Sequence, residues 1–503
     1  MLIAAITRKK YQAFIEDTLH PQAARERLWR HEILPLLNKS VYWPPRLKEL
    51  ASTNLNDFPL TTYEDYQEGL LAAQHGHIQP FNGENITFWS ETSGTSGVRK
   101  FFPITSSYQQ QFQRTMAPFI YNMTQRFPGF FKKKLVYLVA VNSCKTTPAG
   151  TPVGWVSNFN YRNLPAFVKR FYALPDEVFA DAETYEQWAP LYALASDLNA
   201  IFSVTPMVID IFYKRCVEQF VHLLPYLLKE QALPKMLPPL QISKRRQNYL
   251  RELAKNARCS YHDFWPSLLF VGCWTSGLCE YPAQLLQEAL GPQIALIDGT
   301  YSATEGWLTV PLDAEPGGYL HPGGHIVEFI EEGHELCKEN IVQSWELAPG
   351  KNYEIFLTTA MGLVRYQLKD IVKCIGYLNK SPRLVFCYKA QQLKLECCSI
   401  SGQELQQMVH DVSFDVESHW YFARNSLGNR IVLVTDDGAN ISAALLTQMH
   451  ERLRQINQPY AHGIVTKEIL PIVLWQLPKE TLLAEHHAQS KPTLISQQVI
   501  TEK

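Results

Sequence analysis

The chain has 503 residues, of which 46% are hydrophobic and 19% charged, and this length predicts two or three domains. The formal net charge is only -1, which excludes a global field that attracts nucleic acid or an acidic membrane, so small molecules are the expected partners. Ten cysteines are scattered without CxxC pairs, as in a reducing compartment, and no apolar run matches a signal peptide or a membrane span. We therefore expect a cytoplasmic protein.

The N-terminal part of the chain carries helical patterning, for example in "YQAFIEDTLHPQAARERLWRHEILPLL". It ends in the Pro/Asn/Gly-rich stretch "IQPFNGEN", and a segment rich in Gly, Ser and Thr follows at 91–108, "ETSGTSGVRKFFPITSSY". The next helix is predicted with Thr105 or Ser106 as its N-cap. One apolar stripe supports that helix: Phe112, Met116, Phe119, Ile120 and Met123.

Strand-like and helical patterns alternate in the middle of the chain. Helices are predicted at 204–220, where Thr205 would be the cap and Pro206 the first residue, and at 281–291, which Gly291 would close. This alternation favours an α/β fold with mixed, largely parallel sheets and flanking helices. The predicted strands are 134–141, 267–273, 293–298, 325–331 and 352–359.

The pattern changes near Lys389, where short strands and two helices predict a small α+β module. A segment of this length is typical of a domain. We therefore expect a large N-terminal domain over residues 1–387 and a small C-terminal domain over residues 388–503.

Three segments could carry chemistry. The small residues of 92–97 would let backbone N–H groups and hydroxyls converge on phosphate oxygens, although no P-loop spelling is present. In "ALIDGTYSATEGW", a buried strand leads to Tyr301, which could face a base, and to Glu305, which could bind Mg²⁺. In "TTAMGLVRYQLKDIVKCIGY", Asp370 could accept hydrogen bonds from a ribose diol, with Arg365 as an ion-pair partner. Taken singly, each segment is also compatible with a solvated turn or a structural ion pair.

In this order, "TSGTSGVRKFFP", "YSATEG" and "GLVRYQLKD" resemble the three nucleotide motifs of the auxin-responsive acyl-acid amido synthetases, the Gretchen Hagen family. That family is a branch of the adenylate-forming superfamily. "PLTTYEDY", "GYLNKSPRLVF" and "SISGQELQQMV" extend the similarity almost from end to end, and the length suits the bacterial members.

The resemblance implies cofactors and a role for each domain. ATP and Mg²⁺ would be the cofactors. Residues 1–387 would bind ATP and the acyl substrate. Residues 388–503 would form a mobile domain that rotates between two half-reactions.

Site residues are carried over from the family by position. The resemblance implies that loop hydroxyls wrap the ATP phosphates, that Tyr301 packs on adenine, that Glu305 serves Mg²⁺ and phosphate, and that Asp370 binds the ribose. The catalytic residues would be Glu305 and a C-terminal lysine, Lys491 of "HAQSKPTLIS". The expected nucleotide-binding residues are Ser93, Gly94, Thr95, Ser96, Thr300, Tyr301, Thr304 and Asp370.

The sequence departs from the family pattern at three places. The segment around Lys491 is one residue shorter than the family's and lacks its arginine. Lys369 stands where the family has a glycine, at a tight backbone turn. Tyr388, followed by Lys389, stands where the family has a hinge arginine.

Other residues give weaker signals. His321 and His325 lie close together in the sequence, but no spacing supplies further ligands, so we expect them to be solvated or packing histidines. Trp155, Phe159 and Trp274 are candidates for the wall of an acyl pocket or for the core.

The predicted activity is an ATP-dependent ligase that adenylates a small carboxylic acid and transfers the acyl group to an amine, such as an amino acid. We expect a monomer that binds neither nucleic acid nor membrane. Two alternatives remain open: transfer of the acyl group to a thiol such as coenzyme A, or a non-catalytic relative that binds nucleotide or acid as a sensor. The departures at Lys369, Tyr388 and the segment around Lys491 support the second alternative.

Overall fold

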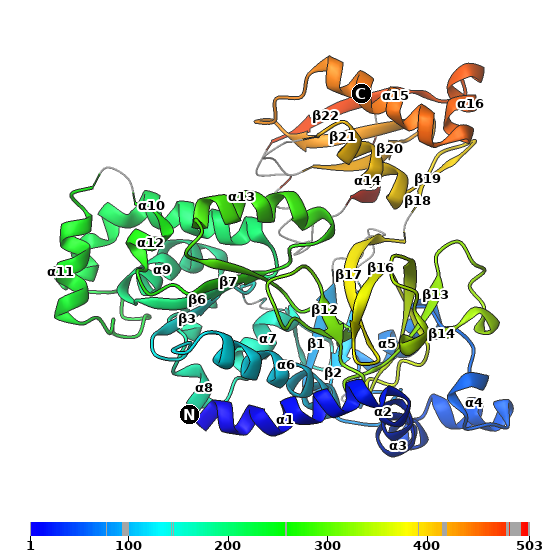
Figure 1. The fold of residues 1–503 in the computed structure, drawn as a ribbon, viewed down its shortest axis with the longest axis horizontal. Coiled ribbons are helices and arrows are strands. Elements are labelled where there is room, and N and C mark those ends of the chain that lie inside the picture. The colour runs from blue at the N-terminus through cyan, green and yellow to red at the C-terminus, as the bar shows by residue number, and fades with distance from the viewer. Residues whose placement is uncertain are drawn as a thin grey trace. The chain divides into compact units, whose positions relative to one another are not determined.

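The structure is a computed structural model and describes residues 2–76, 78–92, 100–141, 143, 145–256, 259–390, 392–414, 420–478, 482 and 494–500. The chain divides into two compact units (Figure 1). The larger unit contains Met1–Glu91, Phe101–Leu368 and Lys373–Phe386, and the smaller contains Thr92–Lys100, Lys369–Val372 and Cys387–Lys503. The domain boundary that the sequence predicts, between residues 387 and 388, stays a prediction.

The N-terminal segment of the larger unit is helical, as its patterning predicts. Helix α1 packs along helix α6, and the rings of Tyr11 and Tyr121 lie 4.8 Å apart. The helices are α1 (Leu2–Leu19), α2 (Pro21–Leu28), the π-helix η1 (Trp29–Ile33), α3 (Leu34–Lys39), α4 (Trp43–Leu50), η2 (Leu55–Asp57), α5 (Glu64–Ala73) and α6 (Ser106–Arg126).

A four-stranded parallel sheet with flanking helices forms the α/β part of this unit (Figure 1). Its order is β3 (Lys134–Tyr137), β6 (Leu198–Phe202), β7 (Phe270–Cys273) and β8 (Ala295–Asp298). The neighbouring helices are α7 (Val156–Arg162), α8 (Ala166–Lys169), η3 (Asp176–Phe179), α9 (Ala182–Ala195), α10 (Pro206–Leu227), α11 (Lys244–Leu253), α12 (Tyr261–Phe264), η4 (Gly277–Cys279) and α13 (Glu280–Leu290).

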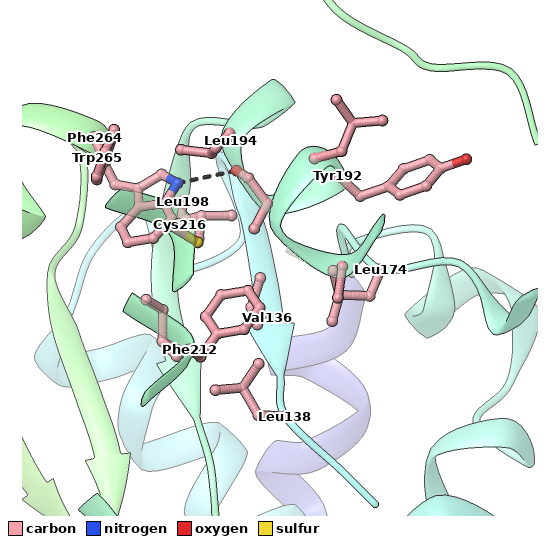
Figure 2. Close-up of a cluster of buried hydrophobic side chains, with 14 of the residues drawn as sticks. Val136, Leu138, Leu174, Tyr192, Leu194, Leu198, Phe212, Cys216, Phe264 and Trp265 are labelled. Atoms are coloured by element: carbon pink, nitrogen blue, oxygen red, sulfur yellow. Dashed lines mark hydrogen bonds between the residues drawn. The ribbon is translucent and has the colours of Figure 1, made fainter. Parts of the chain in front are cut away.

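The core of this part fills the space between the parallel sheet and its helices. Figure 2 shows Val136 of β3 and Leu138, which follows this strand, among side chains of the surrounding helices, including Phe212. The indole of Trp265 is fully buried and donates a hydrogen bond to the Ala193 carbonyl over 2.9 Å, so its one polar atom is satisfied (Figure 2). Because strands of a parallel sheet are covered on both faces, they read as the continuous apolar runs seen in the sequence.

Two further sheets of the larger unit have four and seven strands. The first has the order β2 (Lys100–Ile104), β1 (Phe88–Thr92), β5 (Pro152–Gly154) and β4 (Lys145–Thr146), with β1 and β5 parallel. A sheet of seven strands has the order β11 (Thr309–Val310), β12 (Gly318–Leu320), β17 (Ser381–Lys389), β16 (Tyr366–Leu378), β15 (Asn352–Thr358), β13 (Ile326–Glu331) and β14 (Val342–Gln343). The short 3-10 helices η5 (Lys338–Asn340) and η6 (Ser344–Glu346) lie in its connections. The predicted α/β fold with mixed sheets and flanking helices is confirmed.

Helix α6 begins where the sequence predicts, but its cap is different. Thr105 occupies the N-cap position without a capping hydrogen bond from its side chain. Instead, the Glu84 carboxylate accepts hydrogen bonds from the Ser106 hydroxyl (3.0 Å), the Ser107 amide (3.1 Å) and the Ser107 hydroxyl (2.7 Å). Thr105, one of the two predicted candidates, is therefore the N-cap residue, but its hydroxyl does not cap the helix, and the Glu84 carboxylate does so instead. A carboxylate at a helix N-terminus satisfies an otherwise unpaired amide and interacts favourably with the helix dipole.

The smaller unit has the α+β composition that the sequence predicts. Its sheet has the order β22 (Leu470–Leu477), β21 (Arg430–Asp436), β20 (Trp420–Asn425) and β23 (Ile495–Ile500). Strands β20 and β21 pair antiparallel, and the other two pairs are parallel. The remaining elements are β18 (Gln392–Lys394), β19 (Ser399–Ser401), α14 (Gly402–Asp411), α15 (Ala443–Ile456) and α16 (Gln458–Thr466).

Candidate active site

The predicted phosphate loop lies between strands β1 and β2. Its residues Ser93, Gly94, Thr95 and Ser96 fall outside the residues that the structure describes. Strand β1 leads directly into it, and the buried Glu91 on this strand pairs with the ammonium of Lys145 on β4 at 3.2 Å. This ion pair links strands β1 and β4 of one sheet.

Glu305 lies in a tight hairpin that the sequence does not predict. Strand β9 (Ser302–Ala303) pairs antiparallel with β10 (Gly306–Trp307), so Thr304 and Glu305 form the two-residue turn. Thr304 is partly exposed, whereas Glu305 is buried, with 7% of its surface exposed. A carboxylate at the tip of a short hairpin is held by the backbone on both sides.

The charge of Glu305 acts on three buried tyrosines from distant segments of the chain. Burial and the nearby charge of Glu305 raise the pKa of Tyr108 on α6. Burial raises the pKa of Tyr63 as well; the hydrogen bond from the Phe101 amide partly opposes this, and the Glu305 charge adds to it. Burial raises the pKa of Tyr366 well above its ordinary value, and the charge of Glu305 and a side-chain hydrogen bond to it add to that effect. All three phenols therefore stay protonated at neutral pH.

The residue after Glu305 has to be small. A side chain at Gly306 would meet the imidazole of His325, with its Cβ only 2.9 Å from Nε2. His325 and His321 are buried, and the desolvation that burial causes, together with the charge of Arg114, lowers the pKa of each to about 3. They are packed, neutral histidines, which is one of the two possibilities that the sequence left open. Within the described part of the chain, no three His, Cys, Asp or Glu side chains gather as a metal site.

Thr300 and Tyr301 lie at the carboxyl end of strand β8, next to the Glu305 hairpin. The Thr300 carbonyl accepts a hydrogen bond from the Trp274 indole at 3.0 Å, and the Tyr301 amide donates one to the Thr309 hydroxyl at 2.9 Å. The ring of Tyr301 is buried and stacks on Phe386, with 5.9 Å between the ring centroids. Trp274 is thus held against the strand end.

The other two candidates for the acyl pocket also lie in the larger unit. Phe159 stacks on Phe88, with the ring centroids 4.5 Å apart, and Trp155 precedes helix α7. Phe159 therefore belongs to an aromatic pair. The assignment of either residue to an acyl pocket stays a prediction.

Arg365 pairs with a different acid from the one predicted. Its guanidinium donates to both carboxylate oxygens of Glu328, at 2.9 and 3.0 Å, and both side chains are almost fully buried. Burial alone would raise the pKa of Glu328, but the hydrogen bonds and charges of Arg365 and Arg25 lower it overall. The prediction that Arg365 pairs with Asp370 is therefore wrong. The fork of an arginine suits a two-oxygen pairing of this kind.

Asp370 lies in the smaller unit and is 1% exposed. Its Oδ1 forms an ion pair with the ammonium of Lys389, and the amide of Ala390 donates to the Lys369 carbonyl at 2.8 Å. Lys369 itself has φ of +58°, the left-handed conformation that glycine adopts without cost. Lys369 therefore adopts a backbone conformation that glycine takes up more readily than other residues.

The catalytic candidate Lys491 lies outside the described residues. Among the candidates that the structure describes in the larger unit, Thr300, Tyr301, Thr304 and Glu305 lie on one strand end and the hairpin that follows it. Tyr63, Tyr108 and Tyr366 around Glu305 were not predicted from the sequence. Two of these stand in quoted motif segments, "PLTTYEDY" and "GLVRYQLKD", so a search for buried phenols within the motifs could have found them.

In the described part of the chain, no helix combines the length and the apolar character that crossing a membrane requires.

The sequence matches the GH3 family N-terminal domain over residues 49–293 and the GH3 family central domain over residues 318–389. Ser93 and Asp370 fall within these matches, whereas Glu305 and Lys491 fall outside them.

Similar proteins agree with these matches. Indole-3-acetic acid-amido synthetase GH3.4 of Arabidopsis thaliana is 23% identical over 81% of this chain and 74% of its own length. Jasmonoyl--L-amino acid synthetase JAR4 of Nicotiana attenuata is 25% identical over 70% of this chain and 66% of its own length.

The fold comparison leads to the same family. A solved structure, "AtGH3.15 acyl acid amido synthetase in complex with 2,4-DB", shares the fold with a TM-score of 0.78 at 16% identity, over 96% of this chain and 93% of the other. The two matched domains together take in more than half of the sequence. The predicted resemblance is thus confirmed, and this chain belongs to the GH3 family.

Proposed function

We propose that this chain is an ATP-dependent acyl-acid amido synthetase, which activates a small carboxylic acid as an acyl adenylate and transfers the acyl group to an amine. The observation that carries the proposal is the match to two GH3 domains, in a family whose curated relatives are named as amido synthetases of indole-3-acetic acid or jasmonate. We expect the chain to act as a monomer on small molecules in the cytoplasm.

The reaction has two steps. A carboxylate oxygen attacks the α-phosphorus of ATP, the bond to the pyrophosphate oxygen breaks, and the acyl group becomes a mixed anhydride with AMP. The amine nitrogen then attacks the acyl carbonyl, the bond to AMP breaks, and the amine loses a proton as the amide forms. The protein has to hold two anions together and stabilise the charge on the phosphates.

The chain's residues divide this work between them. Ser93, Thr95 and Ser96 would donate to phosphate oxygens, and Lys491 would bring an ammonium to the α-phosphate. Glu305, a single hard oxygen donor group on a rigid hairpin, fits Mg²⁺ shared with ATP phosphates, since this ion usually takes only one or two protein carboxylates. When bound, Mg²⁺ would neutralise charge on the phosphates.

The remaining candidates would hold the nucleoside. Asp370 would accept hydrogen bonds from the ribose hydroxyls, and Tyr301 would pack on adenine. Gly94, Thr300 and Thr304 would complete the nucleotide contacts. The left-handed backbone at Lys369 supports a retained ribose turn.

Acid-dependent exchange of ³²P-pyrophosphate into ATP, across a library of carboxylic acids, tests the activation step. We expect exchange with at least one acid and its loss in Glu305→Ala, because Mg²⁺ would then lose the protein carboxylate that holds it beside the phosphates. Glu315→Ala removes an exposed acid of the same unit and should exchange normally. Unchanged exchange in Glu305→Ala would remove Glu305 from the mechanism. Saturable ATP binding without exchange for any acid would instead favour the sensor alternative.

A further inference from the structure

The carboxylate of Asp298 lies at the carboxyl end of strand β8 and accepts three hydrogen bonds. The Thr275 amide donates to its Oδ1 over 2.9 Å. The Ser276 hydroxyl donates to Oδ2 over 3.2 Å, and the Gly317 amide donates to the same oxygen over 2.5 Å. Burial raises the pKa of Asp298, and these hydrogen bonds oppose the shift. Because a buried carboxyl group is costly unless donors satisfy it, Asp298 and its three donors hold one another in place.

The three donors come from two segments that are distant in the sequence. Thr275 and Ser276 belong to the β7 loop (residues 274–276), which follows strand β7. This strand pairs in parallel with β8, so that Cys273 lies opposite Asp298. Gly317 directly precedes strand β12 of the seven-stranded sheet. The Asp298 carboxylate therefore joins the ends of two neighbouring parallel strands to the start of a strand in another sheet, all within the larger unit.

The β7 loop is also fastened to the residues that follow Asp298. The Trp274 indole donates to the Thr300 carbonyl over 3.0 Å, and the Gly299 amide donates to the Cys273 carbonyl over 2.7 Å. A side chain at position 299 would not fit, because its Cβ would lie 2.9 Å from Cδ1 of the Trp274 ring. By binding the next two residues of the β7 loop, Asp298 keeps Trp274 against residues 299 and 300.

Tyr301 follows these residues and is held from its other side by the seven-stranded sheet. Its amide donates to the Thr309 hydroxyl over 2.9 Å, and its ring stacks on Phe386 of β17. Asp298 joins the two sides, because it binds both the β7 loop and Gly317 at the start of β12. The place of Tyr301 relative to the parallel sheet thus depends on this carboxylate.

We propose that Asp298 is a positioning residue for nucleotide binding, whose carboxylate holds the β7 loop and β12 in the arrangement that places Thr300 and Tyr301 against the nucleoside of ATP. This inference rests on the nucleotide site of the proposed function, which assigns both residues to ATP. Ligands of open α/β sheets bind beyond the carboxyl ends of the strands, where all three residues lie. Asp298 acts through Thr300 and Tyr301 and is not itself assigned a contact with ATP.

Asp298→Asn is the direct test, because it keeps the size of the side chain and replaces one accepting oxygen by a donating amide group. We expect the Kd for ATP, measured by calorimetric titration without any acid substrate, to rise about tenfold, the effect of one lost hydrogen bond. In pyrophosphate exchange, the KM for ATP should rise by a similar factor, while the KM for the acid stays the same.

Asp197→Asn is the matched control at the opposite end of the same parallel sheet. Asp197 directly precedes β6, and its carboxylate likewise accepts from an amide and a hydroxyl, both of Ser267, over 3.3 and 2.6 Å. It also pairs with the ammonium of Lys133 at 3.1 Å. Asp197→Asn should lower the free energy of unfolding but leave the Kd for ATP unchanged, because its partners lie far along the strands from the nucleotide candidates.

Two milder variants test the route from Asp298 to the nucleotide, and they decide the question should Asp298→Asn not fold. Ser276→Ala removes one donor and should raise the Kd for ATP about two- to fivefold. Trp274→Phe removes the N–H that binds the Thr300 carbonyl and should raise it as well. Combined with Asp298→Asn, Trp274→Phe should add less than about a further twofold, because both changes release the same segment. Fully multiplied effects would contradict this route.

The outcomes separate this inference from the proposed function. An unchanged Kd for ATP in folded Asp298→Asn, or in both milder variants, would overturn the role of Asp298 while leaving the proposed function intact. ATP binding by the wild type without exchange for any acid would count against the proposed function alone, since the comparison of Kd values does not need the reaction. A wild type that binds no ATP would overturn both.

Discussion

At the scale of single residues, the two buried histidines His321 and His325 make stability depend on pH. Neither ring nitrogen of His325, nor Nε2 of His321, has a hydrogen-bond partner among the described residues. Nδ1 of His321 accepts from the Gly323 amide at 3.1 Å, and the ring lies 5.0 Å from that of Phe14. Protonation of either imidazole would place a positive charge in a buried site. The positive charge of Arg114 nearby would repel it.

The sign of the pH effect follows from these pKa values. Each folded pKa is about 3, below the ordinary 6.5, so the unfolded chain binds more protons between these values. We expect the free energy of unfolding to fall between about pH 6.5 and pH 5, by up to about 1.4 kcal/mol per pH unit for each histidine. Urea unfolding at both pH values should show a shallower loss in His325→Gln than in wild type. The exposed His31→Gln is the control, and equal slopes in wild type and His325→Gln would contradict the account.

At the scale of secondary structure, the cap of helix α6 is a second site where charge and stability are linked. Burial raises the pKa of Glu84, but the hydrogen bonds from Thr105, Ser107 and Ser106 lower it more, so its net shift is downward. A depressed carboxyl pKa stabilises the fold above the unfolded value, and this contribution is lost as the pH falls through the folded value. The ionised form is the one that caps the helix.

Removal of this cap should be measurable. We expect Glu84→Ala to lower the free energy of unfolding by about 1 kcal/mol at neutral pH, as other cap removals do. The difference should shrink in acid, where the wild-type carboxyl is protonated. Urea unfolding of Glu84→Ala beside Glu68→Ala, which removes an exposed acid from helix α5, measures the effect. A Glu84→Ala variant as stable as Glu68→Ala would show that the cap contributes nothing.

Features that depend on local sequence were predictable, and those that depend on the fold were not. The apolar stripe of 106–126 predicts helix α6 because its period is that of the helix itself. The capping by Glu84 could not be predicted, since Glu84 lies 22 residues before Ser106 and reaches it only in the fold. The hairpin at Glu305 was missed because strands of two residues are too short to show an alternating pattern.

In the candidate site too, local motifs were predictable from the sequence and tertiary contacts were not. Glu305 could be found because a strand-end motif carries it, whereas its tyrosine neighbours come from three separate segments and meet only through tertiary packing. Arg365 was assigned the wrong acid for the same reason: Asp370 is near it in sequence, but Glu328 on β13 is its partner in space. Sequence proximity therefore identified the motif residues but not their contacts.

At the scale of the whole molecule, the chain has two compact units. Of the candidate residues that the structure describes, Glu305 belongs to the larger unit and Asp370 to the smaller.

The central claim is that the acyl group passes from AMP to an amine. The most direct measurement supplies the purified chain with ATP, Mg²⁺, an acid found by exchange, and an amino acid mixture together with coenzyme A, and identifies the products by mass spectrometry. The account predicts an amide between the acid and an amino acid, formed in equal amount with AMP. A coenzyme A thioester as the only acyl product, or no acyl product at all, would contradict it.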